Sequence, residues 1–193
     1  MPVRDVVILS AARTPIGRYG GSFNDLHPAG LGAVAARAAI ERAGISASDV
    51  DEVVIGQGRQ AGSGPNPGRQ VGHRAGVPHR APAQTINKAC ASSLQAIVSG
   101  AQSVMLGESD VVLAGGIESM SRMPYLIDSI DARWGHRMRN FETAEILARQ
   151  HGITRDQSDT FALDSQRKAK AAMDAGHFSR GGMGMAMAIE RCA

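Results

Sequence analysis

Residues 85–97 read Thr85-Ile-Asn-Lys-Ala-Cys90-Ala-Ser-Ser-Leu-Gln-Ala-Ile97, and this stretch predicts the fold class. Its first residues belong to a short extended piece over 83–86, and its later residues have the pattern of a helix that starts at or just after Cys90. A strand that leads directly into a helix is typical of proteins in which helices cover a sheet. We therefore expect an α/β fold with Cys90 at the junction of a strand and a helix.

Short apolar runs on both sides of this stretch predict further strands. They cover residues 6–9, 53–55 and 111–114, and a fourth run covers 185–189. Because these runs are short and apolar, and several end at a turn or a glycine, we expect strands that are buried on both faces.

Helical patterns lie between these runs. In one helix, ended by Gly44, the face expected to be buried carries Leu31, Val34, Ala35 and Ala38. In a second helix, the expected buried stripe carries Leu94, Ile97, Val98, Ala101, Val104 and Met105. A third opens with a capping box at Thr154 and Gln157 and runs to about Ala175, before Gly176. Residues 56–68 and 119–140 read as irregular loops.

Composition excludes several classes of protein. The 193 residues are 43% hydrophobic and 20% charged, which is enough apolar material for a core and excludes disorder of the whole chain. No apolar run is long enough to span a bilayer, so we expect no membrane segment. The start of the chain lacks the pattern of a signal peptide, and we therefore expect a cytoplasmic protein.

The charge and the few aromatic residues argue against nucleic-acid binding. The net charge is +3 and the pI is about 9.2, which suits a small anionic ligand without requiring one. Aromatic residues make up only 4% of the chain, and the cationic residues are scattered rather than gathered into a stripe.

The chain has two cysteines, Cys90 and Cys192, whose spacing fits neither a metal site nor a redox motif. A thiol at the start of a helix meets free backbone N–H groups and the positive end of the helix dipole, which favour the thiolate. Cys90 is thus a candidate nucleophile for acyl transfer, and the alternative is a small buried core cysteine. We expect Cys192 to be a tail thiol without a role.

Three motifs, in order along the chain, resemble those of the thiolases, the acetyl-CoA acetyltransferase and 3-ketoacyl-CoA thiolase family. They are Ala12-Arg-Thr-Pro-Ile-Gly17, Asn87-Lys-Ala-Cys-Ala-Ser-Ser-Leu-Gln-Ala96 and Gly115-Gly-Ile-Glu-Ser-Met-Ser121. The resemblance covers nearly the whole chain and places Cys90 at the acyl-accepting position. For Arg13 and Glu118 we favour structural roles over ligand or acid–base roles, and we expect Glu118 to fix loops by hydrogen bonds.

The resemblance implies a layered fold, essentially one half of the αβαβα sandwich of thiolases. It implies an acyl-cysteine thioester at Cys90, used in Claisen condensation of acetyl-CoA or in thiolysis of a 3-ketoacyl-CoA. The substrates would be coenzyme A thioesters, with no permanently bound cofactor or metal. The family also packs its first half against a second, so we expect exposed apolar helix faces and a homo-oligomer.

The chain also departs from the family pattern. Residues 1–180 resemble the amino-terminal domain with a shortened loop region at about 119–153, and residues 181–193 resemble the terminal strand of a full-length thiolase. In that register Phe178 stands in place of the acid/base cysteine, and Arg180 in place of an oxyanion-hole glycine. No histidine lies in the context of the family's catalytic histidine, and all six are expected to be surface or loop residues: His27, His73, His79, His136, His151 and His177.

These departures leave an alternative to an impaired acyltransferase. The chain would then be a non-catalytic thiolase-like remnant that only folds or self-associates. A ketosynthase that depends on an acyl carrier shares the cysteine-at-helix arrangement, but the residues around Arg13 and Glu118 resemble the thiolases instead.

Overall fold

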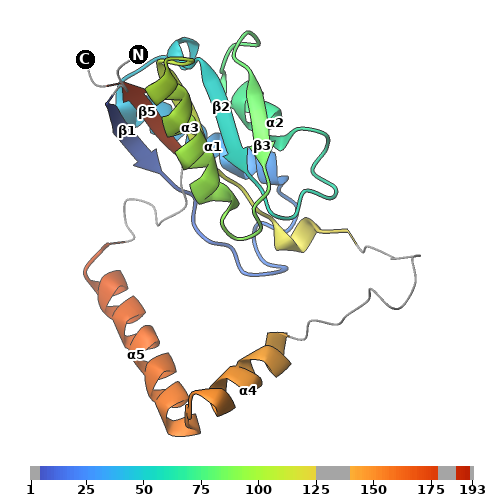
Figure 1. Ribbon diagram of the computed structural model, residues 1–193, viewed down its shortest axis with the longest axis vertical. Helices are drawn as coiled ribbons and strands as arrows, with labels where there is room; N and C mark the ends of the chain where they lie inside the picture. The colour runs from blue at the N-terminus through green and yellow to red at the C-terminus, as the bar shows by residue number, and fades with distance from the viewer. Residues whose placement is uncertain (1–4, 125–139, 178–185, 192–193) are drawn as a thin grey trace. The chain divides into compact units, whose positions relative to one another are not determined.

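The computed structural model describes residues 5–124, 140–177 and 186–191. The chain divides into two compact units, of which the first joins residues 1–124 to residues 181–193. Residues 125–180 form the second unit, in which helices α4 and α5 are described (Figure 1).

A five-stranded sheet in the order β1-β5-β4-β2-β3 forms the centre of the first unit. Its strands are β1 (Val6–Ala12), β2 (Glu52–Gly56), β3 (Ala83–Ile86), β4 (Val111–Gly116) and β5 (Ala186–Arg191). β2 pairs in parallel with β3 and β4, whereas β5 runs antiparallel to both β1 and β4. The sequence predicted all of these strands, with boundaries that differ by no more than a few residues.

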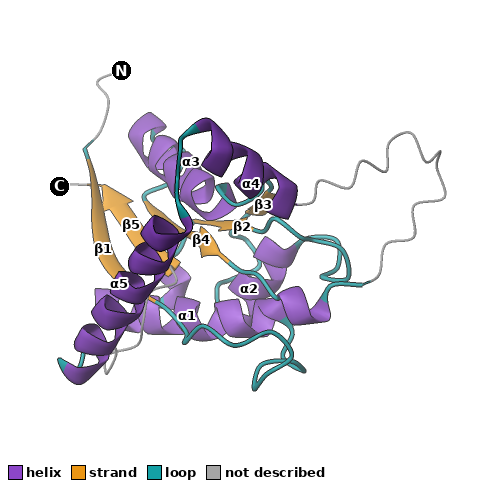
Figure 2. Cartoon of the chain, turned by 90° about the horizontal axis from the view of Figure 1, so that it is seen from below, coloured by secondary structure: helices purple, strands orange, loops and turns teal. Residues whose placement is uncertain are grey.

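Helices cover both faces of this sheet, so the predicted α/β layers are confirmed. α1 (Pro28–Ala43) and α2 (Pro67–Ala75) lie on one face, and α3 (Ser92–Leu106) lies on the other (Figure 2). Two short 3₁₀ turns, η1 (Ala47–Asp49) and η2 (Met120–Arg122), complete the described elements of this unit.

The core lies on both sides of β2 and β4. Val53 and Ile55 belong to the apolar cluster that includes α1 and α2 residues, whereas Val54 packs with Val104 and Val112 on the side of α3. Side chains of a strand alternate between its two faces, so β2 contributes to both clusters. The expectation of strands buried on both faces is confirmed for β2 and β4.

The same expectation is wrong for β1. Val7 is 37% exposed and Ile8 is 58% exposed. Among the described strands β1 lies at the edge of the sheet, beside β5, so it receives less cover than the strands in the middle.

The prediction for the buried stripe of α3 is confirmed only for Val104, which is buried, and for Ile97, which packs against the core. Small residues pack inward at Ser92, Ala96, Gly100 and Ser103. A Cβ atom on Gly100 would lie 2.9 Å from a methyl carbon of Val112, so the helix approaches the sheet closely. Leu94, Val98, Met105 and Leu106 of the same helix are exposed.

α1 ends as predicted, with Gly44 in the left-handed conformation at φ 70°, but its buried face is shifted. Val34, which was expected to be buried, is 52% exposed, while Ala36, Ala39 and Ile40 are buried. The residue before the helix, His27, caps it, and its Nδ1 accepts the N–H of Ala29 at 3.2 Å.

α2 was not predicted, because its first residues were assigned to the loop over 56–68. Asn66 accepts the N–H of Arg69 at 3.0 Å, Pro67 occupies the first helical position, and Gly76 ends the helix. These are ordinary start and stop signals of a helix. They were missed because the stretch is rich in glycine and proline, which is typical of a loop.

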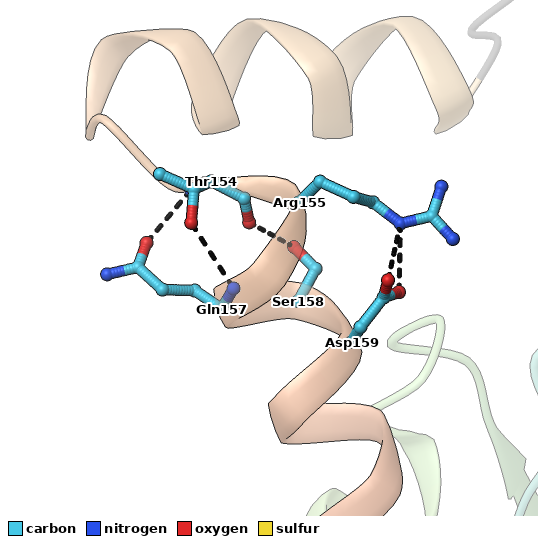
Figure 3. Close-up of polar contacts among 5 residues, drawn as sticks. All are labelled: Thr154, Arg155, Gln157, Ser158 and Asp159. Atoms are coloured by element: carbon cyan, nitrogen blue, oxygen red, sulfur yellow. Dashed lines mark hydrogen bonds and ion pairs between the residues drawn. The ribbon is translucent and has the colours of Figure 1, made fainter.

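The second unit contains α4 (Asn140–Gln150), also not predicted, and α5 (Arg155–Asp174), which starts and ends close to the predicted boundaries. Figure 3 shows the capping box of α5, in which Thr154 Oγ1 accepts the N–H of Gln157 at 3.2 Å and Gln157 Oε1 accepts the N–H of Thr154 at 2.9 Å. Arg155 pairs with Asp159 one turn later. Arg167, Lys168 and Lys170 are exposed, as expected of a solvated helix face.

Among the described residues, no helix combines the length and the apolar character needed to cross a membrane.

Candidate functional site

Cys90 lies between the end of β3 and the start of α3, and its side chain is exposed. α3 begins at Ser92, with Ala91 as an N-cap residue that makes no side-chain hydrogen bond to the helix. Backbone N–H groups at the start of a helix are unpaired within the helix unless a cap accepts them. The structure thus places Cys90 two residues before the start of α3, where the sequence predicted the helix to begin at or just after Cys90, and α3 has no side-chain cap. The exposed Cys90 lies outside the core.

The turn that carries Cys90 is held by hydrogen bonds. Ala89 has φ 49°, a left-handed conformation that non-glycine residues rarely adopt. Its N–H donates to Asn87 Oδ1 at 3.0 Å, and its carbonyl accepts the Ser92 hydroxyl at 2.6 Å. The Ser92 hydroxyl in turn accepts the N–H of Lys88 at 2.8 Å. Strained backbone of this kind persists where its surroundings fix it, and it is concentrated at functional sites.

Two glycines bring the start of α3 onto the sheet. Gly56 and Gly116 are the last residues of the parallel strands β2 and β4, and they are paired in register. A Cβ atom on Gly56 would overlap the backbone of Ser92, and one on Gly116 would overlap the Ser93 side chain. Cys90 therefore lies near the carboxyl ends of parallel strands, where open α/β sheets bind ligands.

A cavity of about 790 Å³ opens beside Cys90. Residues after the ends of β2 and β4 line it together with Cys90, among them Gln57, Arg59, Ile117 and Glu118. The volume lies within the ordinary range of small-molecule sites.

Gln57 is the most buried polar residue of this cavity, with 1% of its surface exposed. Its Nε2 donates to Ser63 Oγ at 2.8 Å and to the Arg59 carbonyl at 3.0 Å, and lies 3.5 Å from Glu118 Oε1. Its Oε1 has no hydrogen-bond partner among the described residues. A buried acceptor without a donor is a rare feature, and here it belongs to a side chain that lines the Cys90 cavity.

Glu118 fixes a loop, as the sequence predicted. One oxygen of its carboxylate accepts the N–H of Gly58 at 3.1 Å and the N–H of Arg59 at 3.0 Å. These bonds hold the segment after β2 against the segment after β4, and both segments line the cavity. The structural role of Arg13 stays a prediction. Its Nε is buried without a partner in the described part of the chain.

The described histidines do not line the Cys90 cavity. His27 caps α1, and its pKa is lowered by burial and, to a smaller extent, by the charges of Arg74 and Arg122. His73 and His79 are exposed and stack with ring centroids 5.1 Å apart. His151 and His177 are exposed residues of the second unit. The predictions for His136, Phe178, Arg180 and Cys192 lie outside the described residues.

Sequence reasoning did not single out Gln57, Gly56 or Gly116 as parts of the site. A signal was present, because both glycines end apolar runs that predict strands. Gln57 follows directly after one of them, at the edge of the sheet where ligands bind.

Comparison with known proteins gives a consistent result. A family model described as the N-terminal domain of thiolase matches residues 6–144 and 141–182. The acetyl-CoA acetyltransferase of Cupriavidus necator is 43% identical over an alignment of 195 positions that covers 90% of this chain and 49% of that protein. A probable acetyl-CoA acetyltransferase of Escherichia coli is 41% identical, over 91% of this chain and 50% of that protein. This chain therefore spans about half the length of these curated relatives.

Solved structures agree with this match. The acetyl-CoA acetyltransferase of Bacillus anthracis superposes with a TM-score of 0.82 at 35% identity, over 92% of this chain and 50% of that one. The Acat5 thiolase of Ascaris suum, solved in complex with coenzyme A, gives a TM-score of 0.83 at 34% identity, over 93% and 52%. The ordered motifs, the layered fold and the extent of these matches lead to one conclusion: this chain belongs to the thiolase family.

Proposed function

We propose that this chain is an acyl-CoA acyltransferase of the thiolase type, with Cys90 as its nucleophile. The observation that carries the proposal is the position of Cys90, which is exposed, lines a cavity and lies two residues before the start of α3, a helix without a side-chain cap. The names of its relatives, acetyl-CoA acetyltransferases, support a coenzyme A thioester as the substrate. The reactions would be those of fatty acid metabolism, in the cytoplasm.

The first step follows from this arrangement. The Cys90 sulfur attacks the carbonyl carbon of the thioester, and a new carbon–sulfur bond forms. The bond from that carbon to the sulfur of coenzyme A then breaks, and coenzyme A leaves as its thiol with the proton that Cys90 gave up. N–H groups at the start of a helix stabilise the oxyanion formed on the way.

The second step, in which an acetyl-CoA carbanion attacks the acyl-cysteine, requires a base near that carbon. Among the described residues that line the Cys90 cavity, Glu118 is the carboxylate, and its oxygen already accepts two backbone N–H groups. We therefore propose that Cys90 accepts an acyl group and that condensation and thiolysis are impaired.

Intact mass measurement tests the first step. After incubation with acetyl-CoA at neutral pH, the chain is expected to gain one acetyl group, and the gain should disappear in Cys90→Ala. A Cys192→Ala variant is the matched control, since it leaves Cys90 as the only thiol and should still be acetylated. An unmodified mass in the Cys192→Ala variant, in which iodoacetamide still alkylates Cys90, would refute the proposal.

A non-catalytic remnant is the second candidate, favoured by the absence of a histidine from the Cys90 cavity in the described residues. The two candidates differ in one measurement. Acetyl transfer to Cys90 supports the acyltransferase, whereas an intact fold without transfer supports the remnant. Acetylation without any carbon–carbon bond formation would identify a half-enzyme that stops after its first step.

Self-association is expected whether the chain is an acyltransferase or a non-catalytic remnant. The exposed apolar residues of α3 form a row on one side of the helix, at Leu94, Val98 and Met105. Rows of this kind favour contact with another apolar surface. We propose that the chain forms homo-oligomers.

A further inference from the structure

A basic surface lies on the side of the sheet that α1 and α2 cover (Figure 2). The sequence has no aspartate or glutamate between Glu52 and Glu108, and α2 and the loop after it belong to this stretch. Side chains of α1, α2 and that loop form the surface, and all but the half-buried Arg69 are exposed. We call it the basic face, and its residues are Arg37, Arg69, His73, Arg74, His79 and Arg80.

Contacts between α1, α2 and the loop join the residues of the basic face. Arg37 Nη1, on α1, donates to the Arg74 carbonyl in the last turn of α2 at 2.7 Å. The rings of His73 and His79 stack with their centroids 5.1 Å apart, which joins α2 to the loop. Cationic residues that are scattered along the sequence are therefore neighbours in the fold.

Backbone carbonyls hold the arginines in place without neutralising them. Arg69 Nη2 donates to the Ala81 carbonyl at 2.7 Å, and Arg80 Nη2 donates to the Ser48 carbonyl. Each guanidinium group keeps further N–H donors, since arginine has five. A side chain that is already held loses less conformational entropy when it binds a ligand. The basic face is thus prepared for an anion.

Ion pairs do not balance the charge of the basic face. None of its four arginines pairs with a carboxylate in the described part of the chain. The nearest acidic residues along the chain are Glu41, one turn after Arg37 on α1, and Asp49, whose carboxylate already accepts the N–H of Ser46 at 2.8 Å. The charge of Arg74 helps to lower the pKa of His27, after the larger effect of burial. The surface therefore carries excess positive charge.

The basic face is separate from the Cys90 cavity, since none of its residues lines that cavity. Arg80 is bonded to Ser48, which comes before β2, whereas Cys90 follows the end of β3. β2 and β3 are parallel, so the two places lie toward opposite ends of these strands. A ligand on the basic face is therefore not the acyl donor at Cys90.

The chemistry of the basic face favours phosphate groups. Guanidinium groups bind oxyanions through pairs of parallel N–H bonds. A phosphate group offers three acceptor oxygens and up to two charges, so it can contact two guanidinium groups, whereas a carboxylate has two oxygens and one charge. Two stacked imidazole rings repel each other when both are protonated, and a nearby anion with more than one charge offsets that repulsion.

We propose that the basic face binds a soluble compound that carries several phosphate groups. The inference does not rest on the proposed function, because it involves no chemistry at Cys90. Histidine gains its charge between about pH 8 and pH 5, so protonation of His73 and His79 strengthens the binding of the anion. Binding in turn favours protonation by the same factor.

Isothermal titration calorimetry of the full chain with tripolyphosphate tests the proposal, in a buffer of about 0.15 M salt that screens weak surface charge. We expect saturable binding. Hexaglutamate is the comparison polyanion, and it should bind at least about tenfold more weakly because it lacks phosphate. Equal affinity for hexaglutamate, or heat that does not saturate, would overturn the inference, because either result would leave only a general cationic surface.

The arginine variants test the place of binding. Arg74→Gln combined with Arg80→Gln removes two exposed charges and should weaken tripolyphosphate binding about tenfold. Arg155→Gln combined with Arg167→Gln, at exposed positions of α5, is the matched control with the same change in charge and should bind like the unsubstituted chain. Unchanged affinity of the Arg74→Gln and Arg80→Gln variant, with a circular dichroism spectrum that shows it folded, would overturn the inference.

The histidine variants test the role of the stacked rings. In His73→Gln combined with His79→Gln, the ligand still titrates but the rings do not. The ratio of the affinities at about pH 6 and about pH 8 should therefore be at least about threefold larger in the unsubstituted chain than in this variant. Equal ratios would overturn the assignment of the two histidines to the site.

Vesicles of phosphatidylglycerol distinguish a soluble ligand from a lipid surface. The chain should bind tripolyphosphate and should not sediment with the vesicles at about 0.15 M salt. Sedimentation with the vesicles, without any binding of tripolyphosphate, would overturn the inference, because the phosphates would then be those of lipid headgroups.

Discussion

Gly56, at the end of β2, lies so close to Ser92 that a Cβ atom on residue 56 would overlap the Ser92 carbonyl group. Ser92 is the first residue of α3 and is buried, with 3% of its surface exposed. The contact therefore fixes the distance between the start of α3 and the sheet. It also fixes the position of Cys90, which lies two residues earlier.

Gly56→Ala is expected to destabilise the fold, because the atoms in its way belong to backbone and cannot rotate aside. We expect a loss of about 1–3 kcal/mol in the free energy of unfolding, typical of overpacking. Urea denaturation measures this loss, and the alkylation rate of Cys90 reports any displacement of the helix start.

Gly30→Ala is the control, since Gly30 is inside α1 and a Cβ atom there would meet nothing within 4 Å. That change should stabilise the helix by about 0.5–1 kcal/mol. Equal stability of Gly56→Ala and the unsubstituted chain would contradict the prediction.

Stability should depend on the charge of His27. Its pKa in the folded chain is lowered from about 6.5 by burial and then by Arg74 and Arg122. As the pH falls below 6.5, the unfolded chain takes up this proton before the folded chain does, so the free energy of unfolding decreases. Protonation also removes the Nδ1 acceptor that caps α1 at the N–H of Ala29. Above pH 6.5 the contribution of the neutral imidazole is fully present.

His27→Asn supplies a cap that does not titrate. Denaturation of both proteins between pH 8 and pH 5 should show a constant difference above about pH 6.5. Below that pH, the stability of the variant should rise relative to that of the unsubstituted chain. Curves that stay parallel throughout would show that His27 is not responsible.

Removing the charge of Glu118 should loosen the loop beside Cys90. Glu118→Gln weakens the two charge-assisted hydrogen bonds from Gly58 and Arg59, at a cost of about 1–3 kcal/mol. Hydrogen exchange of these two amides should become faster, and the free energy of unfolding should fall. Glu108→Gln, at an exposed position after α3, is the matched control and should change neither. Unchanged exchange at residues 58 and 59 would count against the role given to Glu118.

The exposed row of α3 should control self-association. Leu94→Glu and Val98→Glu place charge on residues that are 62% and 42% exposed, so the fold of the monomer should tolerate them. Sedimentation velocity is expected to show oligomers of the unsubstituted chain and a shift toward monomer in the variants. Lys168→Glu, at an exposed position of α5, is the control and should keep the oligomers. A monodisperse monomer of the unsubstituted chain would rule out this interface.

The strands and the position of Cys90 could be predicted from local sequence alone. Runs such as 53–55 and 111–114 are apolar without alternation, which is the pattern of a strand covered on both sides. The start of α3 was also local information, because a strand, a turn and a helix follow one another within residues 83–97.

The buried faces of the helices could not be predicted in the same way. In α3 Val104 is buried, but Leu94, Val98 and Met105 are exposed. Close approach to the sheet leaves room for small residues such as Ala96 and Gly100 along the earlier turns of the helix. Hydrophobicity alone predicts that the larger apolar residues of the helix are buried. The close contact between helix and sheet instead favours small residues at the positions that face the sheet. Gln57 and Glu118 form a contact although they lie far apart in the sequence, so no local pattern predicts it.

The place of β5 in the sheet has a consequence for synthesis on the ribosome. β1 ends at Ala12 and lies beside β5 at the edge of the sheet that the described strands form, and β5 begins at Ala186. At the usual pace of translation, roughly ten to thirty-five seconds separate the appearance of these two strands. During that interval the edges of β1 and β4 stay unpaired and are open to other chains. A newly made chain is thus most exposed to aggregation through these strand edges before β5 emerges.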